Sequence, residues 1–442
     1  MSERNRWLAL YMLCAGELLI VLDTTVVNVA LPSIQADLGF SEAALVWVVN
    51  AYMVTYGGFL LLGGRLGDLY GRRRLFLLGT ALFTFASLAC GLSGSQEVLV
   101  AARAVQGLGG AVVSAIALSL IMDLFTEPGE RAKAMGIFGF VCAGGGSVGV
   151  LAGGLLTSTL GWNWVFLVNL PLGAAVYALC ARLLPADTPQ AAGMRLDLAG
   201  AVTITTASML AVYGIVNGSA LLTVAAAALL GAFLVIETRV SQPLMPLRLF
   251  RLRSLSAANA IGVLWAAAMF AWFFIAALYL QHTLGYDAMQ VGLAFLPANL
   301  IMAAFSIWLS AKVVMRFGIR LPIVVGMLLS AAGLGVFVFG HVLTGMLLLG
   351  LGCGMALNPV MLAGMSDVDP SESGLASGVL NTSFMMGGAI GLAALARISE
   401  SAGYQAAFAI GAGFALLAAL LGALFLRAAA PASKGNGVCQ VA

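Results

Sequence analysis

Three charged side chains stand inside long apolar stretches of this 442-residue sequence, and their types suggest proton or ion chemistry. Glu17 and Asp23 lie in the first apolar stretch, and Arg103 lies in the fourth. A charge in the middle of a membrane is costly and usually faces a partner or a cavity. A carboxylate beside Arg103 in one state and away from it in another would release and load a proton. A static ion pair that only locks helix packing is the alternative interpretation.

Glu17 and Asp23 are six residues apart, which places them about 120° apart around a helix. The two carboxylates therefore face different neighbours, one of them a cavity and the other Arg103. We expect Asp23 to bind and release a proton. Glu17 is predicted to bind a cationic substrate, to carry a second proton, or to pack near the membrane surface. Arg103 and Gln106 share one helix face, where their polar atoms need partners inside the protein.

Further side chains are candidates for contact with a small molecule. Asn28 shares the face of Glu17 in the first stretch, and Gln106 belongs to the Arg103 face. Phe384 and Met385 offer adaptable apolar surface late in the chain, although packing against lipid or protein is the alternative. The candidate substrate contacts are therefore Glu17, Asn28, Gln106, Phe384 and Met385.

The composition explains where these residues must lie. The chain is 62% hydrophobic and only 9% charged, whereas about a quarter of the residues of a soluble domain are charged. Its apolar blocks have the length of about 20 residues that a helix needs to cross a bilayer. Backbone groups in lipid must be satisfied internally, and the alternation typical of barrel strands is absent. The sequence therefore predicts an all-α polytopic membrane protein.

About 14 transmembrane helices are expected. Their predicted ranges are 7–30, 45–63, 75–93, 97–122, 134–156, 162–183, 197–217, 220–237, 255–280, 291–312, 321–339, 342–365, 375–396 and 404–427.

The distribution of Lys and Arg predicts the orientation. With the N-terminus in the cytoplasm, nearly all basic residues outside the spans fall in cytoplasmic segments, and the opposite loops hold only Arg397. An excess of basic residues marks cytoplasmic loops. Both termini are therefore expected in the cytoplasm, with the chain in the cell inner (plasma) membrane.

Two long segments, 184–196 and 238–254, divide the chain. They predict an N-terminal six-helix bundle over 1–185, a two-helix insertion with flanking loops over 186–254, a C-terminal six-helix bundle over 255–428 and a tail over 429–442. The short basic turns 64–74 and 311–320 both place a glycine before an arginine, which indicates weak internal symmetry. Parallel six-helix repeats are typical of transporters that bind substrate at the midplane.

Two glycine-containing motifs are expected to serve movement. The turn GRLGDLYGRRR combines acid and arginines, which favours a breakable latch at the cytoplasmic mouth over ordinary loop charge. Its candidate latch residues are Gly64, Asp68, Gly71 and Arg72. The fifth span carries glycines that permit close helix approach or bending. Its candidate motif is Gly145, Gly149, Gly153 and Gly154.

Other classes of function are disfavoured. The six cysteines have no metal-ligand spacing, so neither a metal site nor a disulfide framework is expected. No phosphate-binding Walker pattern is present, and the loops are too short for a nucleotide-binding domain. We expect no enzyme activity, no cofactor and no nucleic-acid partner.

Several runs resemble the major facilitator superfamily, and in particular its fourteen-span drug:proton antiporter family. They are LDTTVVNVALP at 22–32, the GRLGDLYGRRR turn, the span around Arg103, WVFLVNLPLG at 164–173 and GLASGVLNTS at 374–383. The resemblance covers nearly the whole chain. One departure is Val150, which stands where the antiporter motif of the fifth span carries proline.

The resemblance implies a major facilitator fold of two six-helix bundles plus a two-helix insertion, acting as a monomer. It implies alternating access and export of amphipathic drugs, antibiotics or natural products, driven by inward proton flow. In such proteins the aspartate at the position of Asp23 is implicated in proton coupling and the arginine at Arg103 assists it. A facilitator, or a proton-coupled importer of a small metabolite, is the alternative function.

Overall fold

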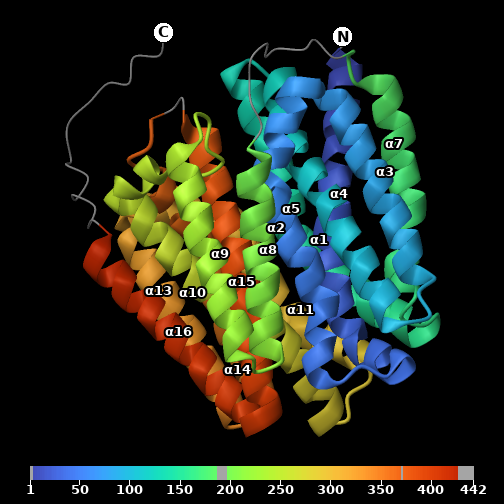
Figure 1. The fold of residues 1–442 in the computed structure, drawn as a ribbon, viewed down its shortest axis with the longest axis vertical. Coiled ribbons are helices and arrows are strands. Elements are labelled where there is room, and N and C mark those ends of the chain that lie inside the picture. The colour runs from blue at the N-terminus through green and yellow to red at the C-terminus, as the bar shows by residue number, and fades with distance from the viewer. Residues whose placement is uncertain (1–2, 187–196, 370–371, 427–442) are drawn as a thin grey trace.

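The computed structural model describes residues 3–186, 197–369 and 372–426 as long helices that run roughly side by side (Figure 1). Thirteen described helical segments are long and apolar enough to cross a bilayer. The shorter α11 (Ala288–Ala304) continues through η3 (Phe305–Leu309) into α12 (Ser310–Phe317) and supplies one more crossing segment. The expected all-helical, multi-pass fold is confirmed. We call the end where α1 begins the inner end and the opposite end the outer end, following the predicted orientation.

The N-terminal half contains seven helices. Polar caps start two of them, because the Ser41 and Ser95 hydroxyls accept hydrogen bonds from backbone N–H groups of the first helical turns. Within this half α1 packs against α5 and α7, and α4 packs against α2 and α3. The helices are α1 (Glu3–Leu38), α2 (Glu42–Tyr70), α3 (Arg72–Gly91), α4 (Gln96–Leu124), α5 (Pro128–Thr159), α6 (Trp164–Leu167) and α7 (Asn169–Leu183).

The predicted sixth span is two helices rather than one. The helix is interrupted at Val168, between α6 and α7. Pro171 explains the break, because it has no N–H to donate to the carbonyl four residues earlier and is tolerated only in a first turn. The break places Asn169 at the start of α7, where its side chain is 1% exposed.

The insertion is a hairpin of α8 (Leu198–Val216) and α9 (Ala220–Arg239). The carboxylate of Asp197 caps α8 by accepting from the Gly200 N–H at 2.7 Å. The hairpin lies against both halves, because α8 packs on α2 and also on α15 (Ser373–Ala402). In Figure 1, α8 and α9 lie at the front of the molecule, between the blue N-terminal helices and the red C-terminal helices.

The C-terminal half begins with the short helix η1 (Leu247–Arg251). An Asp287–Gln290 capping box starts α11. A π-helical turn, η3, interrupts the predicted tenth span, and such turns are frequent at functional sites. The remaining elements are α10 (Arg253–Leu278), η2 (Tyr279–Thr283), α13 (Arg320–Val338), α14 (Val342–Met365), α15 and α16 (Tyr404–Phe425).

Two glycines at equivalent turns support the internal symmetry of the fold. Gly71 lies between α2 and α3 with φ of 100°, and Gly318 lies between α12 and α13 with φ of 74°. Only glycine adopts such angles without strain. Both turns are at the inner end, each after the second crossing segment of its half.

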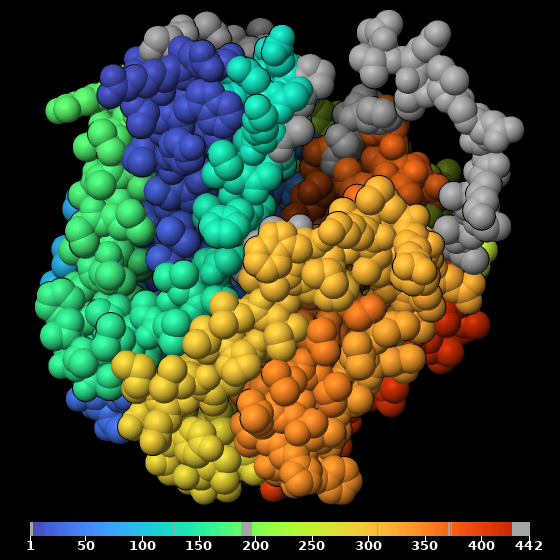
Figure 2. Space-filling model, turned by 180° about the vertical axis from the view of Figure 1, so that it is seen from behind, coloured from blue at the N-terminus to red at the C-terminus, as the bar shows by residue number. Residues whose placement is uncertain are grey.

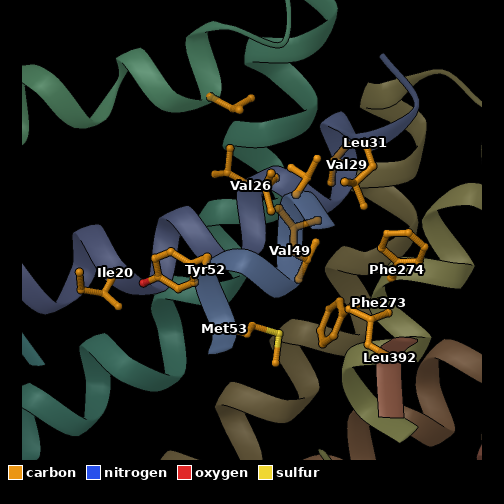
Figure 3. Close-up of a cluster of buried hydrophobic side chains, with 14 of the residues drawn as sticks. Ile20, Val26, Val29, Leu31, Val49, Tyr52, Met53, Phe273, Phe274 and Leu392 are labelled. Carbon is orange, nitrogen blue, oxygen red and sulfur yellow. The ribbon is translucent and has the colours of Figure 1, made fainter. Parts of the chain in front are cut away.

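The two halves meet toward the outer end. Asn50 donates from its amide nitrogen to the Ala389 carbonyl oxygen at 2.9 Å, and Gln281 donates to the Val29 carbonyl at 3.1 Å. Buried apolar side chains of α1 and α2 face those of α10 and α15 around this contact (Figure 3). At the inner end the surface is hollowed between the blue-green half and the orange half (Figure 2).

Candidate functional site: a buried charge cluster between the N-terminal helices

Asp23 and Arg103 form an ion pair at the middle of the N-terminal half. The Nη1 atom of Arg103 donates to Asp23 Oδ2, and each of the two side chains is at most 1% exposed. Two charges are stable away from water only when their remaining polar atoms are also satisfied. The residues around the pair must therefore supply further hydrogen-bond partners.

Arg103 has hydrogen-bond partners at both Nε and Nη1. Its Nε donates to the Val48 carbonyl of α2 at 2.8 Å, and Nη1 also donates to Gln106 Oε1 at 2.6 Å. The guanidinium lies over the Tyr52 ring, 4.5 Å from its centroid, and 5.6 Å from that of Phe166. Aromatic faces stabilise a desolvated cation. These contacts fix Arg103 against α2, α4 and α6.

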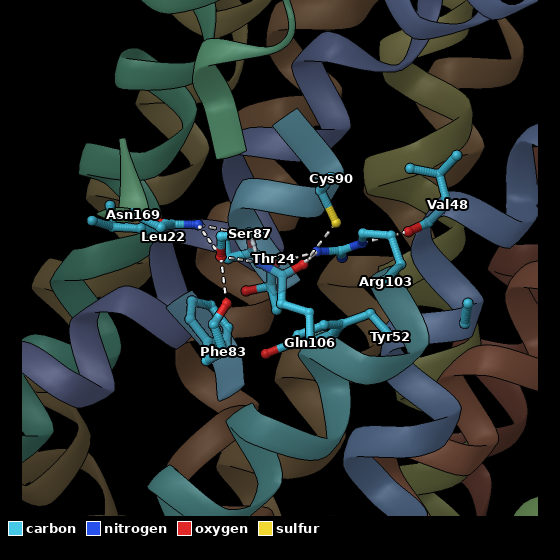
Figure 4. A network of polar contacts seen from close by, with 12 residues as sticks. Leu22, Thr24, Val48, Tyr52, Phe83, Ser87, Cys90, Arg103, Gln106 and Asn169 are labelled. Atoms are coloured by element: carbon cyan, nitrogen blue, oxygen red, sulfur yellow. Dashed lines mark hydrogen bonds and ion pairs between the residues drawn. The ribbon is translucent and has the colours of Figure 1, made fainter. Parts of the chain in front are cut away.

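Asp23 accepts from three side chains. Besides Arg103, the Gln106 amide donates to Asp23 Oδ1 at 2.7 Å, and the Asn169 amide donates to the same oxygen at 3.1 Å. Ser87 joins the cluster from α3, because its hydroxyl accepts from Gln106 at 2.8 Å (Figure 4). The three contacts to Asp23 all use its carboxylate oxygens as acceptors. A proton added to Asp23 would therefore place a donor among donors and break part of the cluster.

Glu17 lies apart from this cluster, as the predicted separation around α1 requires. Its carboxylate accepts from the Ser114 hydroxyl of α4 at 2.8 Å, and the side chain is 8% exposed. Six residues of helix rise place it about 9 Å from Asp23 along the axis, toward the inner end. The two acids thus have separate partners on one helix.

The remaining four candidate substrate contacts lie in four different surroundings. The Asn28 amide donates to the Thr24 carbonyl within α1. Gln106 is 0% exposed and faces the charge cluster rather than open space. Phe384 packs against the Trp265 and Phe270 rings, whose centroids lie 5.5 and 5.7 Å away. Met385 lies against Gly57 of α2, where an added Cβ would be only 2.8 Å from the Met385 Cβ.

The fifth-span glycines pack two helices tightly onto α5. Cβ atoms built on Gly145, Gly149 and Gly153 would lie 2.9 Å or less from atoms of α1. Gly154 faces the other half, where a Cβ would lie 2.9 Å from the Ala288 carbonyl oxygen of α11. Although Val150 replaces the family's proline, α5 is a single helix, and a Cβ at Gly292 would meet the Val150 carbonyl at 3.0 Å.

The predicted latch turn forms a three-membered charge cluster at the inner end. Arg72 Nη2 donates to Asp68 at 2.8 Å, and Nη1 donates to Asp123, at the end of α4, at 2.5 Å. Gly71 provides the positive-φ turn between them in the chain. A Cβ on Gly64 would lie 3.9 Å from the nearest neighbouring atom, so no close approach requires glycine there.

The same turn also holds the insertion. Arg65 donates from its two terminal nitrogens to the carbonyls of Gln242 (2.7 Å) and Pro243, in the loop after α9. That loop is anchored in turn by Glu237, whose carboxylate accepts from the Met245 N–H at 2.9 Å. The inner end of α2 and the hairpin are therefore connected directly.

Four members of these clusters were not predicted as site residues. Asn169 lies in a run that resembles the family, and a lone amide in an apolar span was an available signal. Ser87 and Ser114 gave no such signal, because serine in a helix commonly bonds to its own backbone. Asp123 lies near a predicted span end, where an acid is unremarkable.

Comparison with known proteins agrees with this architecture. The chain matches the Major Facilitator Superfamily over residues 13–392 and 260–438. It is 37% identical to the puromycin resistance protein pur8 of Streptomyces alboniger, over 99% of this chain and 95% of that one. It is 39% identical to the cephamycin export protein CmcT of Amycolatopsis lactamdurans, over 89% and 85%. It is also 34% identical to the lincomycin resistance protein of Streptomyces lincolnensis, over 97% and 94%.

Solved structures share the fold at low sequence identity. The peptide transporter POT superposes with a TM-score of 0.71 at 20% identity, over 94% of this chain and 93% of that one. The xylose transporter XylE from E. coli, in an inward-open conformation, superposes with a TM-score of 0.67 at 18% identity, over 97% and 98%. The family match and the full-length relatives lead to one conclusion: the chain belongs to the major facilitator superfamily of membrane transport proteins.

Proposed function

We propose that the protein exports amphipathic small molecules by proton antiport with alternating access. The observation that carries the proposal is the buried Asp23 carboxylate, held by Arg103, Gln106 and Asn169. Relatives across nearly the full length are named for export of, or resistance to, puromycin, cephamycin and lincomycin. Small, partly apolar natural products of this kind are the substrate class that we expect.

Proton coupling follows from the chemistry of the Asp23 cluster. The Asp23 carboxylate joins α1 to α4 and α7 through side-chain contacts. A proton neutralises it, weakens the contact with Arg103 and frees α1 to move relative to its neighbours. Loading at the outer face and release at the inner face then couple inward proton flow to one cycle of transport.

Glu17 is the proposed contact for a cationic group of the substrate. Its carboxylate lies nearer the inner end than Asp23 and has Ser114 as a hydrogen-bond partner. Asn28, on the same face of α1, and the apolar side chains Phe384 and Met385 of α15 are the proposed further contacts. An ammonium group beside Glu17 would form a charge-assisted hydrogen bond in a site of low dielectric constant.

The contacts between the halves suggest which state is described. Hydrogen bonds join the halves at the outer end, whereas the surface is hollowed at the inner end (Figure 2). A further outer contact links the Tyr404 hydroxyl to Glu42 at 3.2 Å, with His282 Nδ1 3.3 Å from that hydroxyl. We propose that this state is open to the cytoplasm and that these contacts close the outer face.

Tyr404→Phe is expected to favour opening of the outer face. It removes the hydrogen bond to Glu42 without changing the ring, and such a bond contributes about 0.5–1.5 kcal/mol. The equilibrium should therefore shift about twofold to tenfold toward the outward-open state. A cysteine placed at Ala389, in a background whose native cysteines are serine, reports the shift by its labelling with an impermeant maleimide. Equal labelling rates with and without the substitution would contradict the outer-closure assignment.

Asp123→Asn is expected to alter turnover while leaving stability nearly unchanged. It removes one of the two acids that hold Arg72 and keeps the Asp68 contact within the turn. Ion pairs with this exposure are worth about 0.2–1 kcal/mol, so the balance of states should move at most about fivefold. The transport rate and the melting temperature of purified protein measure the two effects. A large fall in melting temperature would assign the pair to folding instead of gating.

We also propose the division of the chain into two six-helix bundles, over 1–185 and 255–428, and an insertion over 186–254. The packing of α8 on both α2 and α15 supports an insertion that contacts both bundles. Cytoplasmic termini and a monomer in the plasma membrane complete the proposal.

The export proposal is tested by accumulation of amphipathic dyes and antibiotics in cells that express the protein. We expect lowered accumulation that returns to the level of empty cells when a protonophore collapses the gradient. Lowered accumulation that persists with the protonophore would favour a facilitator, and raised accumulation would favour an importer.

A further inference from the structure

A cavity of about 490 Å³ lies between the insertion hairpin and the C-terminal half. Its walls are mainly apolar side chains of α8, α9 and α15, with Val263 of α10 and Met245 of the loop after α9. The hydroxyl groups of Ser208 and Ser383 add neutral polar atoms to this wall. Thr223 and Thr382 also line it, but their hydroxyls donate to the carbonyls of Ser219 and Gly57. No charged side chain lines the cavity among the described residues. The volume falls in the range of about 300–1,000 Å³ that is usual for small-molecule sites.

The cavity lies beside the seam at which the two halves touch. At Gly58 of α2 a Cβ would lie 2.1 Å from the Thr205 hydroxyl of α8 and 3.2 Å from the Met386 methyl group of α15. Helices α2, α8 and α15 therefore meet at one point, and α8 covers the α2–α15 seam. Met386 also lines the cavity, so a flexible thioether side chain is shared between the cavity and the seam.

The wall that α9 contributes to the cavity lies on the lipid-facing side of the protein. Only 17% of an 18-residue apolar stretch of α9 is buried, which is the smallest share among the spanning helices described. Leu230 and Leu234 line the cavity and are more than 40% exposed. A compound dissolved in the membrane would therefore meet α9 first and would need to pass only the hairpin to reach the cavity.

We propose that this cavity binds the uncharged, apolar part of a membrane-dissolved amphipathic compound and is an entry site on its way to the α2–α15 seam. The inference rests on the proposed function, since the compound is the transported substrate. Three observations favour such a compound over a lipid acyl chain. The wall contains the Ser208 and Ser383 hydroxyl groups, Met386 lies next to the seam, and the neighbouring residue Met385 already faces α2 at Gly57.

The test is photolabelling of the full-length protein in lipid nanodiscs, without a proton gradient. The probe is a rhodamine dye that carries a diazirine on its apolar arm. We expect labelled peptides from α8, α9 and α15, including Thr223 or Met386, and competition by excess unlabelled dye. Ala227→Phe fills the cavity and should weaken labelling about tenfold, or about 1.4 kcal/mol. The neighbouring Ala228→Phe is the matched control, because Ala228 is exposed and lies outside the cavity lining.

Three outcomes would overturn the entry site. The first is no labelling on these helices, and the second is equal labelling of Ala227→Phe and Ala228→Phe. The third is competition by phosphatidylglycerol but not by dye, which would make the cavity a lipid site. An Asp23→Asn variant separates the two proposals. Suppose that the cavity is labelled in this variant and that the unmodified protein shows no proton-driven transport. These two results would refute antiport and keep the binding site. Proton-driven transport without cavity labelling would keep antiport and refute the entry site.

Discussion

Replacing Asp23 by asparagine should abolish the response of transport to a pH gradient while leaving substrate exchange in place. Asparagine keeps the size of the side chain and can accept from Arg103, Gln106 or Asn169, but it cannot lose or gain a proton. A coupling free energy of about 1–3 kcal/mol links two ligands of an allosteric protein, which corresponds to roughly 5- to 150-fold. The effect of the gradient on dye accumulation should fall by this factor.

Everted membrane vesicles provide the measurement. An imposed pH gradient should drive dye uptake by the unmodified protein and not by Asp23→Asn, whereas exchange of internal for external dye should continue in both. Glu97→Gln is a suitable control, because it also neutralises an acid, but on an exposed turn at the start of α4. Undiminished gradient-driven uptake by Asp23→Asn would remove Asp23 from the coupling step and direct attention to Glu17.

The contrast between Glu17 and Asp23 shows what could be predicted from the sequence. Charged residues are so scarce in the spans that Arg103 was the only basic residue predicted away from a span end, and helical geometry showed that only one acid would face it. The structure places Asp23 against Arg103 and gives Glu17 a different partner in Ser114. Rare charges and a regular helix were sufficient for this pairing.

Neutral partners could not be predicted in the same way. A serine or threonine in an apolar helix satisfies itself by donating to the carbonyl four residues earlier, as Ser87 does to Phe83 at 2.8 Å. Its sequence context is then the same whether or not its oxygen also accepts from another helix. The role of Ser87 beside Gln106 depends on how α3 and α4 are rotated, and that is set by packing over their whole length.

Helix number and helix continuity also differed in how well they could be predicted. The hydropathy blocks located the crossing segments, but the break at Val168 depends on Pro171, which was assigned to the interior of a span. The cavity under the hairpin had no sequence signal, because its lining comes from residues between Ile204 and Ile390 that are mostly ordinary apolar side chains in each helix. Such a space arises only where separately predicted elements fail to fill the volume between them.

Arg103→Ala should be the most destabilising single substitution in the cluster. It would leave the Asp23 carboxylate buried without its cation, and breaking a buried ion pair from one side costs about 3–5 kcal/mol. It would also leave the Val48 carbonyl without the Nε donor and remove the guanidinium from the Tyr52 ring. We expect a clear fall in the melting temperature of the purified protein and lower amounts in the membrane.

The double substitution Asp23→Asn with Arg103→Gln separates the cost of an unpaired charge from the loss of packing. Both buried charges are then absent, and the two amides remain able to hydrogen-bond to each other and to Gln106. We expect the double variant to be more stable than Arg103→Ala and than Arg103→Gln alone, because coupling within a charge pair makes the two effects non-additive. A double variant whose losses simply add would show that the pair contributes no interaction energy to folding. A stable double variant that still exchanges dye without responding to a pH gradient would assign the charges to coupling, since the fold would then have been shown not to require them.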